Sequence, residues 1–184
     1  EDYGLSGEPG EDAFELEPEP LYEYPPELFV DYAGEAPLLD ACLKKQNLKV
    51  EEFFGCFLAS PDLRRQIFAC MERILEDKNR AINIILTGEE RSGKTTLAKS
   101  IATCTQMLGG ISSPRVAVIR GDKLNHIDLE VKKQQLRGTT MIVEHAAGMT
   151  GEKAAQLLSL NSDFAGETAV ILEEERRRMN QFLR

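Results

Sequence analysis

The first segment with a clear hydrophobic pattern is residues 61–76, where apolar positions recur every three or four residues. Ser60 is a natural N-cap and Pro61 fits the first helical position. The apolar face is formed by Leu63, Ile67, Cys70, Met71, Ile74 and Leu75. A similar spacing begins near Pro37, and a further apolar patch occupies residues 53–58. We therefore expect a helical lead-in over residues 38–79.

Beyond this lead-in, short apolar runs alternate with helical patterns. The runs at 81–86, 115–119, 140–143 and 168–172 are too short for helices and predict strands. Between and after them, helical patterns begin at 94, 128, 151 and 174, the first ending at Gly109 and Gly110. Alternation of this kind predicts an α/β domain over residues 80–184, with a parallel sheet and helices on both faces.

Charge is distributed unevenly along the chain. The 184 residues carry a net charge of −9, yet residues 1–40 hold thirteen acidic side chains and no Lys or Arg. This stretch also contains six of the eight prolines and all four tyrosines. The composition predicts an acidic, Pro- and Tyr-rich disordered tail over residues 1–37. It serves as a spacer or, alternatively, as a docking segment centred on 21–29, and its charge disfavours nucleic acid as a partner.

Composition also narrows the class of protein. No apolar stretch approaches the roughly 20 residues needed to span a bilayer, so we expect no membrane partner. The four cysteines are widely spaced, lack a C-x-x-C pair and have apolar neighbours, which predicts buried free thiols rather than a zinc site. A soluble protein of the reducing cytoplasm is the expectation. The chain starts without an initiator Met, which suggests a piece of a longer protein.

The segment after the first predicted strand matches the phosphate-loop pattern G-x-x-x-x-G-K-[ST] at every fixed position. In such a loop the glycines allow a sharp turn and a close backbone approach to phosphate, and a helix N-terminus adds its dipole. Lys94 would reach the β- and γ-phosphates, and the Thr95 hydroxyl would bind Mg²⁺. The predicted nucleotide-binding residues are Gly88, Glu89, Glu90, Arg91, Ser92, Gly93, Lys94, Thr95 and Thr96.

Two of these loop residues are acidic. Glu89 and Glu90 must point outward, and their field should still weaken nucleotide binding, with Arg91 offsetting only part of it. We expect a modest affinity for nucleotide.

Residues 81–183 resemble AAA+ ATPases, a group of P-loop NTPases, and particularly the rubisco-activase-like and stage V sporulation protein K-like group. Residues 85–98 are similar to that group's Walker A segment, 141–146 to its Walker B strand, and 170–172 with 179–182 to its fourth strand and helix. The resemblance implies an ATP- or ADP-binding domain with Mg²⁺. It places Glu144, beside Thr95, among the metal ligands.

The chain departs from this family at several positions. The resemblance puts His145 where the family has its catalytic Glu, so His145 becomes a candidate base; a hydrogen-bonded residue at the sheet end is the simpler interpretation. Glu173 stands where the family places a polar sensor such as Asn or Thr. Residues 124–127 lack the pattern that grips a threaded polypeptide, and neither the fifth strand nor the helical lid appears before Arg184.

Three functions remain open at this point. The first is an ATP-binding AAA-like module of a larger protein, with weak or absent hydrolysis. The second is an active ATPase that uses His145 or a base from another chain, and the third is an interaction module without nucleotide. A protein partner or a homo-oligomer is compatible with each.

Overall fold

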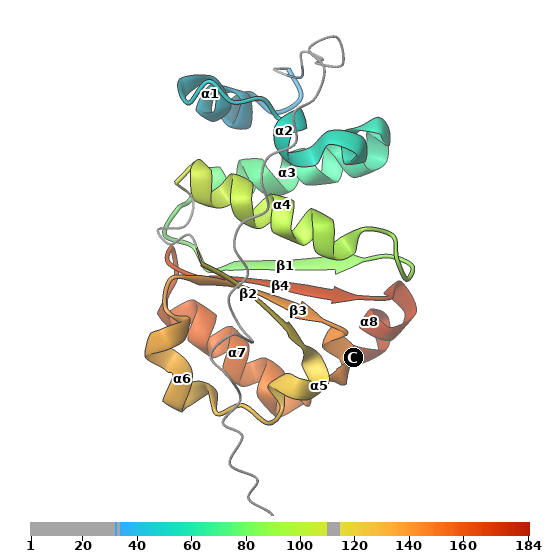
Figure 1. Cartoon of the computed structure of the whole chain (residues 1–184), viewed down its shortest axis with the longest axis vertical. Coiled ribbons are helices and arrows are strands. Elements are labelled where there is room, and N and C mark those ends of the chain that lie inside the picture. Colours follow the sequence, from blue (N-terminus) through green and yellow to red (C-terminus); the bar gives the residue numbers. More distant parts are fainter. Residues whose placement is uncertain (1–31, 33, 110–114) are drawn as a thin grey trace, which may run out of the picture.

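The computed structural model describes residue 32, residues 34–109 and residues 115–184, and within them the sheet has four parallel strands. These are β1 (Ile82–Thr87), β2 (Arg115–Arg120), β3 (Thr139–Glu144) and β4 (Ala169–Glu174), in the order β1-β4-β3-β2. The prediction of an α/β fold with a parallel sheet is confirmed. All the strand carboxyl ends therefore lie at one edge of the sheet (Figure 1).

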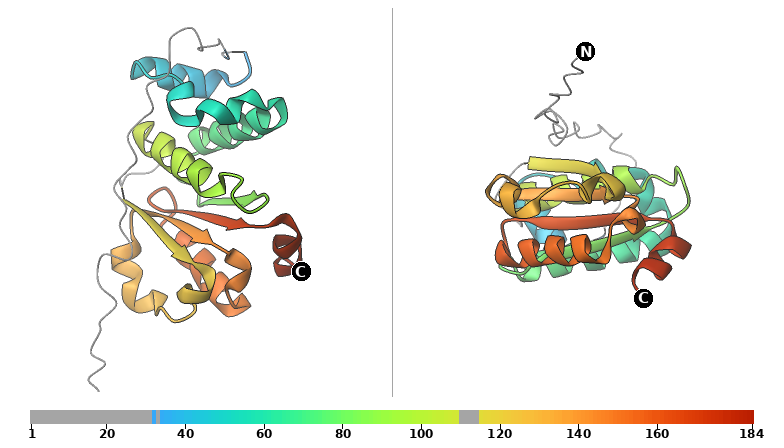
Figure 2. Two further views of the ribbon diagram at one scale, coloured as in Figure 1. Left: turned by 45° about the vertical axis from the view of Figure 1, so that its right-hand side comes forward. Right: turned by 90° about the horizontal axis from the view of Figure 1, so that it is seen from below.

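One face of the sheet is covered by α4 (Lys94–Met107), and the helical lead-in packs on the outer side of this helix (Figures 1 and 2). The lead-in contains α1 (Pro37–Lys45), α2 (Glu51–Phe54), the 3₁₀ helix η3 (Gly55–Ala59) and α3 (Pro61–Glu76). Ser60 caps α3 as predicted, its Oγ accepting from the Leu63 amide. A single apolar core joins α1, α3 and α4 to the upper face of the sheet.

The opposite face carries α6 (Leu129–Leu136) and α7 (Gly151–Asp163), which follow β2 and β3 respectively. Alternate residues of one strand therefore enter two separate cores. In β4, Ile171 joins the core beneath α4, whereas Val170 and Leu172 join the core against α7. Short helices α5 (Gly121–Leu124), η4 (Ala146–Gly148) and α8 (Arg176–Phe182) complete the chain.

The expectation of helices over both faces is wrong at β1. This strand is an edge strand whose ladder partner in the described residues is β4. Its inward side chains pack under α4, but Asn83, Ile85 and Thr87 are exposed on the other face, Ile85 by 45%. Asn161 of α7 donates to the Ile82 carbonyl and to the Asn83 side chain at the start of β1, but Ile85 and Thr87 further along the strand stay exposed, so its apolar run is only half-buried.

The predicted element positions agree with the structure to within about two residues, with one informative difference. The terminal helix was expected from Glu174, but β4 continues through Glu174 and α8 begins at Arg176. Both Glu173 and Glu174 are buried strand residues, 3% and 2% exposed. Glu174 accepts two backbone amides at the sheet edge, whereas Glu173 meets, among the described residues, only the Thr95 hydroxyl, as described below.

Packed structure begins before the predicted tail boundary at residue 37. The Tyr32 ring packs edge-on against Phe68 of α3, with ring centroids 5.5 Å apart, and Arg64 lies over the Tyr32 ring. Ala36 is buried, and Glu35 pairs with Arg64 at 3.0 Å. The remainder of the predicted tail lies outside the described residues.

The free thiols differ in exposure. Cys104 is buried, Cys42 and Cys70 are partly buried, and Cys56 is exposed, so the prediction of burial is wrong for Cys56. Burial raises the pKa of the Cys70 and Cys104 thiols, which keeps both protonated. Among the residues described, no helix has the length and apolar character required to cross a bilayer.

Candidate functional site

The predicted phosphate loop connects β1 to α4 at the carboxyl edge of the sheet, the edge at which open parallel sheets bind ligands (Figure 1). The loop is tied to the sheet at its start, where the Gly88 amide donates to the carbonyl of Glu174 at 3.3 Å. A Cβ at position 88 would lie 2.6 Å from the Ser92 Oγ. A side chain at position 88 would therefore force the Ser92 hydroxyl to move.

The backbone turns into α4 through left-handed conformations. Gly93 is the N-cap of α4 with φ of 85°, and Arg91 has φ of 60°. The side chains of Ser60, Asp128 and Thr150 accept hydrogen bonds from the first amides of α3, α6 and α7 respectively. Among the residues that the structure describes, no side chain caps α4. The first amides of α4 are thus left without a side-chain acceptor, as an anion-binding helix start requires.

Lys94 folds back on the loop. Its Nζ donates to the carbonyls of Gly88 at 3.1 Å and Glu89 at 2.7 Å. These carbonyls hold the ammonium group at the loop, and phosphate oxygens would offer it stronger, charged acceptors. Lys94 is therefore already placed at the loop and would exchange two neutral acceptors for an anion.

The next residue, Thr95, contacts two carboxylates. Its Oγ1 lies 3.2 Å from the Glu144 Oε1 at the end of β3 and 2.8 Å from the Glu173 Oε2 near the end of β4. We call Thr95, Glu144 and Glu173 the carboxylate cluster. The strand register explains the meeting, because Val143 pairs with Leu172 and the next step places Glu144 beside Glu173.

Burial and neighbouring charges shift the pKa of one carboxyl of the cluster. The pKa of the Glu173 carboxyl is raised to about 7, chiefly because burial disfavours its charged form. The hydrogen bond from Thr95 lowers this pKa, the charge of Glu144 raises it, and the charges of Lys94 and Lys99 lower it. The other carboxylate oxygen of Glu173, Oε1, is buried and has no hydrogen-bond partner.

Glu174, one residue further, points to the opposite face and is satisfied. Its Oε2 accepts from the Ala147 amide at 3.0 Å and its Oε1 accepts from the Glu175 amide at 2.9 Å. Arg178 adds a longer ion pair at 3.8 Å. Glu174 thus holds the turn after β3. Both of its carboxylate oxygens have hydrogen-bond partners, whereas the preceding residue, Glu173, has one oxygen without a partner in the described residues.

His145 lies immediately after β3 and is exposed. Its backbone is left-handed, with φ of 49° and ψ of 50°, where it forms the N-cap of η4. Glu144 is the last residue of β3 and meets Thr95 of α4, whereas His145 lies beyond the strand. The structure brings Thr95 and Glu144 together but shows no contact from the His145 side chain to the carboxylate cluster.

The other predicted loop residues form the outer surface of the loop. Glu89, Glu90, Arg91, Ser92 and Thr96 are all exposed. The outward orientation expected for the two acids is confirmed. In a phosphate site these residues would contribute through their backbone, and their charges would act through solvent.

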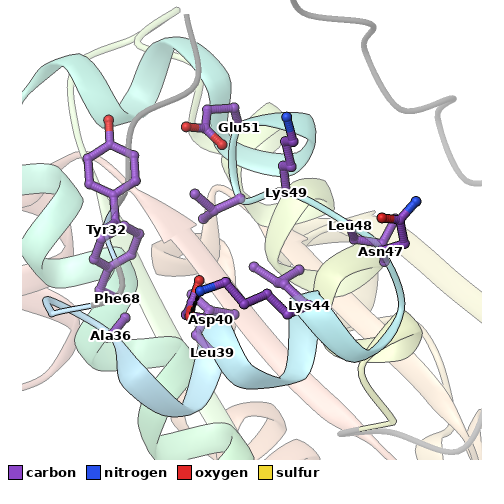
Figure 3. A pocket seen from close by; sticks show the side chains of 12 residues that line it. Tyr32, Ala36, Leu39, Asp40, Lys44, Asn47, Leu48, Lys49, Glu51 and Phe68 are labelled. Carbon is purple, nitrogen blue, oxygen red and sulfur yellow. Dashed lines mark ion pairs between the residues drawn. The ribbon is translucent and has the colours of Figure 1, made fainter. Parts of the chain in front are cut away.

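A cavity of about 430 Å³ lies elsewhere, in the helical lead-in (Figure 3). Leu39, Leu43, Val50 and Phe68 contribute its apolar wall, and the Asp40–Lys44 ion pair of 2.7 Å lies at its rim. No residue of the phosphate loop or of the carboxylate cluster lines it. The cavity and the candidate phosphate site are separate features.

The oxygen atoms of the carboxylate cluster fit a hard divalent cation. Mg²⁺ prefers one or two carboxylates supplemented by hydroxyl, water and phosphate oxygens. In the part of the chain that the structure describes, no three His, Cys, Asp or Glu side chains gather around a metal position. The set here is two carboxylates and one hydroxyl, which suits Mg²⁺ and lacks the nitrogen and sulfur ligands typical of zinc.

Sequence reasoning assigned Thr95 and Glu144 to a metal but treated Glu173 as a departure from a family pattern. The alternation of side chains along β4 could have placed Glu173 on the face toward α4, because Glu173 is two residues beyond Ile171 and shares its face. Comparison of the sequence with models of known protein families found no match, and no curated protein matched it either. The functional argument therefore rests on the residues and their geometry.

Proposed function

We propose that residues 80–184 form an ATP-binding, AAA-like P-loop module that hydrolyses ATP weakly or not at all. The observation that supports this proposal best is the distance of 3.2 Å between the Thr95 Oγ1 and the Glu144 Oε1. The loop proposed as a phosphate loop and the strand that resembles a Walker B strand are 49 residues apart in sequence, and they meet at the two atoms that we propose as metal ligands. A phosphate-loop motif that arose by chance has no reason to meet a strand-end carboxylate.

Each residue then has a defined role. The loop amides and the uncapped first turn of α4 bind the phosphates, and Lys94 moves its ammonium group from the Gly88 and Glu89 carbonyls to the β- and γ-phosphate oxygens. Thr95 and Glu144 hold Mg²⁺. When bound, this ion neutralises charge on the phosphate oxygens.

Weak hydrolysis follows from the position of His145. A general base must lie within hydrogen-bond reach of the attacking water, directly or through one further water. The His145 side chain is exposed and has no described partner that would orient it toward the phosphates. An ATPase that uses His145, or a base from another chain, is the alternative enzyme hypothesis, and a module without nucleotide is the non-enzyme hypothesis.

The proposal includes a setting. We place the module in a larger cytoplasmic protein, with a protein partner or further copies of the chain as candidates for assembly. The resemblance to AAA+ ATPases is part of the same proposal and is supported by the parallel sheet, the loop position and the contact between Thr95 and Glu144.

Thermal unfolding with nucleotide tests the proposal. Mg-ATP and Mg-ADP should raise the melting temperature of the wild-type chain, and ligand at 100 times Kd adds about 2.7 kcal/mol to the free energy of unfolding. Lys94→Ala should remove most of this effect, because no other loop side chain brings a full positive charge to the phosphates. Lys132→Ala, which removes an exposed lysine on α6, is the matched control. An unchanged melting curve at millimolar nucleotide would overturn the proposal.

A further inference from the structure

We infer that Glu173 is a third oxygen ligand of the cation site formed by Thr95 and Glu144, and that this site binds Mg²⁺ or Mn²⁺ without nucleotide. The inference relies on the proposed function for the location of the site and deepens it. It adds a residue that the motifs do not predict and an order of binding in which the metal can precede the nucleotide.

The first argument is a count of hydrogen atoms. The Thr95 hydroxyl carries one hydrogen, yet two carboxylate oxygens, one from Glu144 and one from Glu173, lie within hydrogen-bond distance of it. The hydroxyl can donate to only one of them at a time. When both carboxylates are ionised, the second one therefore faces an oxygen lone pair of Thr95, and a cation shared by all three oxygens relieves this repulsion.

The second argument is the unpartnered oxygen of Glu173. This side chain is only 3% exposed, and its Oε1 has no hydrogen-bond partner in the described residues. A buried carboxylate oxygen without a partner costs free energy. The neighbouring Glu174 shows that the same sheet edge can satisfy both oxygens of a buried carboxylate, since it accepts two backbone amides. The deficit is specific to the side chain that faces Thr95.

The backbone positions of the three proposed ligands are also fixed by the fold. Glu144 and Glu173 project from adjacent central strands, and Thr95 projects from the first turn of α4, so backbone hydrogen bonds fix all three positions. The strand pairing fixes the backbone positions from which the two carboxylates project, so only side-chain rotation can move them apart. Lys94, the nearest loop cation in sequence, directs its hydrogen bonds to the Gly88 and Glu89 carbonyls rather than to either carboxylate.

Charge sets the order of binding. Mg²⁺ is usually held by one or two carboxylates together with substrate phosphates, and affinity for divalent cations rises with the number of charged ligands. Binding of a cation displaces any proton held by the cluster, and Glu144 and Glu173 then present two negative charges to it before any phosphate arrives. The site is thus suited to bind a divalent cation by itself.

The test uses the full chain, freed of metal by chelation, and Mn²⁺ alone as the probe. The electron paramagnetic resonance signal of free Mn²⁺ measures binding in the absence of nucleotide. Wild type should bind one Mn²⁺ per chain, and Glu173→Gln and Glu144→Gln should each weaken the affinity about 10-fold or more. Glu130→Gln, which removes an exposed acid on α6 at the opposite face of the sheet, is the matched control and should leave the affinity unchanged.

Two outcomes overturn the inference: wild type that binds no Mn²⁺ without nucleotide, or Glu173→Gln that folds and binds Mn²⁺ as tightly as wild type. The far-ultraviolet circular dichroism spectrum shows whether each variant folds. If Glu173→Gln does not fold, Glu173→Asp keeps the charge on a shorter side chain and should bind Mn²⁺ more weakly than wild type; equal binding would again overturn the inference.

The same measurements separate this inference from the proposed function. A chain that is stabilised by Mg-ATP through Lys94 but binds no Mn²⁺ alone keeps the function and loses the role of Glu173. A chain that binds Mn²⁺ through Glu173 but gains no stability from nucleotide keeps the cation site and loses the proposed function.

Discussion

The ring of Phe57 lies against Gly93, so closely that a Cβ at position 93 would stand 3.3 Å from the ring Cε1 and 3.4 Å from the Cζ. Phe57 belongs to η3 in the helical lead-in, and Gly93 is the N-cap of α4 in the phosphate loop. The lead-in therefore supports the loop directly. The boundary at residues 79 and 80 separates two sequence patterns but not two independent packing units.

This contact predicts the effect of Gly93→Ala. The substitution introduces a left-handed φ of 85° for a residue with a side chain and a tight contact with Phe57, so the free energy of unfolding should fall by about 1–3 kcal/mol. Urea unfolding measures this loss. Gly151→Ala is the control, because a Cβ there meets nothing within 4 Å and its φ is not positive.

A double-mutant cycle separates the two causes. Phe57→Ala should relieve only the steric part of the loss caused by Gly93→Ala. The double variant should therefore lose about 0.5–3 kcal/mol less free energy of unfolding than the sum of the two single variants. Additive effects would mean that backbone strain alone makes glycine necessary at this position.

Removal of the exposed loop acids should tighten nucleotide binding. Glu89→Gln with Glu90→Gln takes two negative charges from the surface of the phosphate site, and calorimetry with Mg-ATP should show a lower Kd. Because both side chains act through solvent, the gain should shrink as salt is raised above about 0.15 M. Weaker binding by the double variant would assign these side chains a direct role.

Single-turnover hydrolysis should be slow in wild type and insensitive to His145→Ala. Positioned general-base catalysis is worth about 10²–10⁴-fold in rate, and the exposed His145 has no described contact that would provide it. We expect bound ATP to persist for many minutes, with Lys94→Ala as the blank. His145→Glu should restore a small rate if the new carboxylate reaches the bound water.

Two results would contradict the prediction of weak hydrolysis. Rapid wild-type turnover that disappears in His145→Ala would make His145 the base. Turnover that rises steeply with protein concentration would point to a second chain completing the site.

The raised pKa of Glu173 predicts a pH-dependent stability in metal-free buffer. The folded state holds the Glu173 proton up to about pH 7, whereas the unfolded chain releases it near the ordinary glutamate value of about 4.3. The folded state therefore binds more protons between these values, and this group lowers the stability as pH rises through that window. As the pH is raised from about 5 to 8, the free energy of unfolding of Glu173→Gln should increase relative to that of wild type. A constant difference would contradict the prediction.

Tyr32 marks where packing begins. Tyr32→Ala removes the contact with the Phe68 ring and the cation contact with Arg64, and should lower the free energy of unfolding by about 1–3 kcal/mol. Deletion of residues 1–31 should change the melting temperature little if the acidic segment is a spacer, as its composition predicts. A drop of many degrees on deletion would mean that the segment belongs to the fold rather than serving as a spacer.

The sequence predicted the strands, the helices that cover them and the phosphate loop because each has a local signal: an apolar run, a helical period or a fixed glycine spacing. It also placed Thr95 and Glu144 in one site. It did not predict the contact between Glu173 and Thr95, because strand parity gives the face on which Glu173 lies but not the partner, which is 78 residues away. The half-buried state of β1 was missed for a related reason: an apolar run of six residues looks the same at the edge and at the centre of a sheet.

The strand order also affects how the chain folds as it is synthesised. The neighbouring strands β2 and β3 can pair once residue 144 has been synthesised. Because β1 pairs with β4, Ile82 cannot pair until Ala169 has been synthesised. The ladder that completes the candidate site is the last to form, and contacts this distant in sequence form slowly. Until then the phosphate loop follows a strand without a partner. A ribosome-bound chain that ends before residue 169 should therefore be readily cut by protease at β1, whereas the completed chain should be protected there.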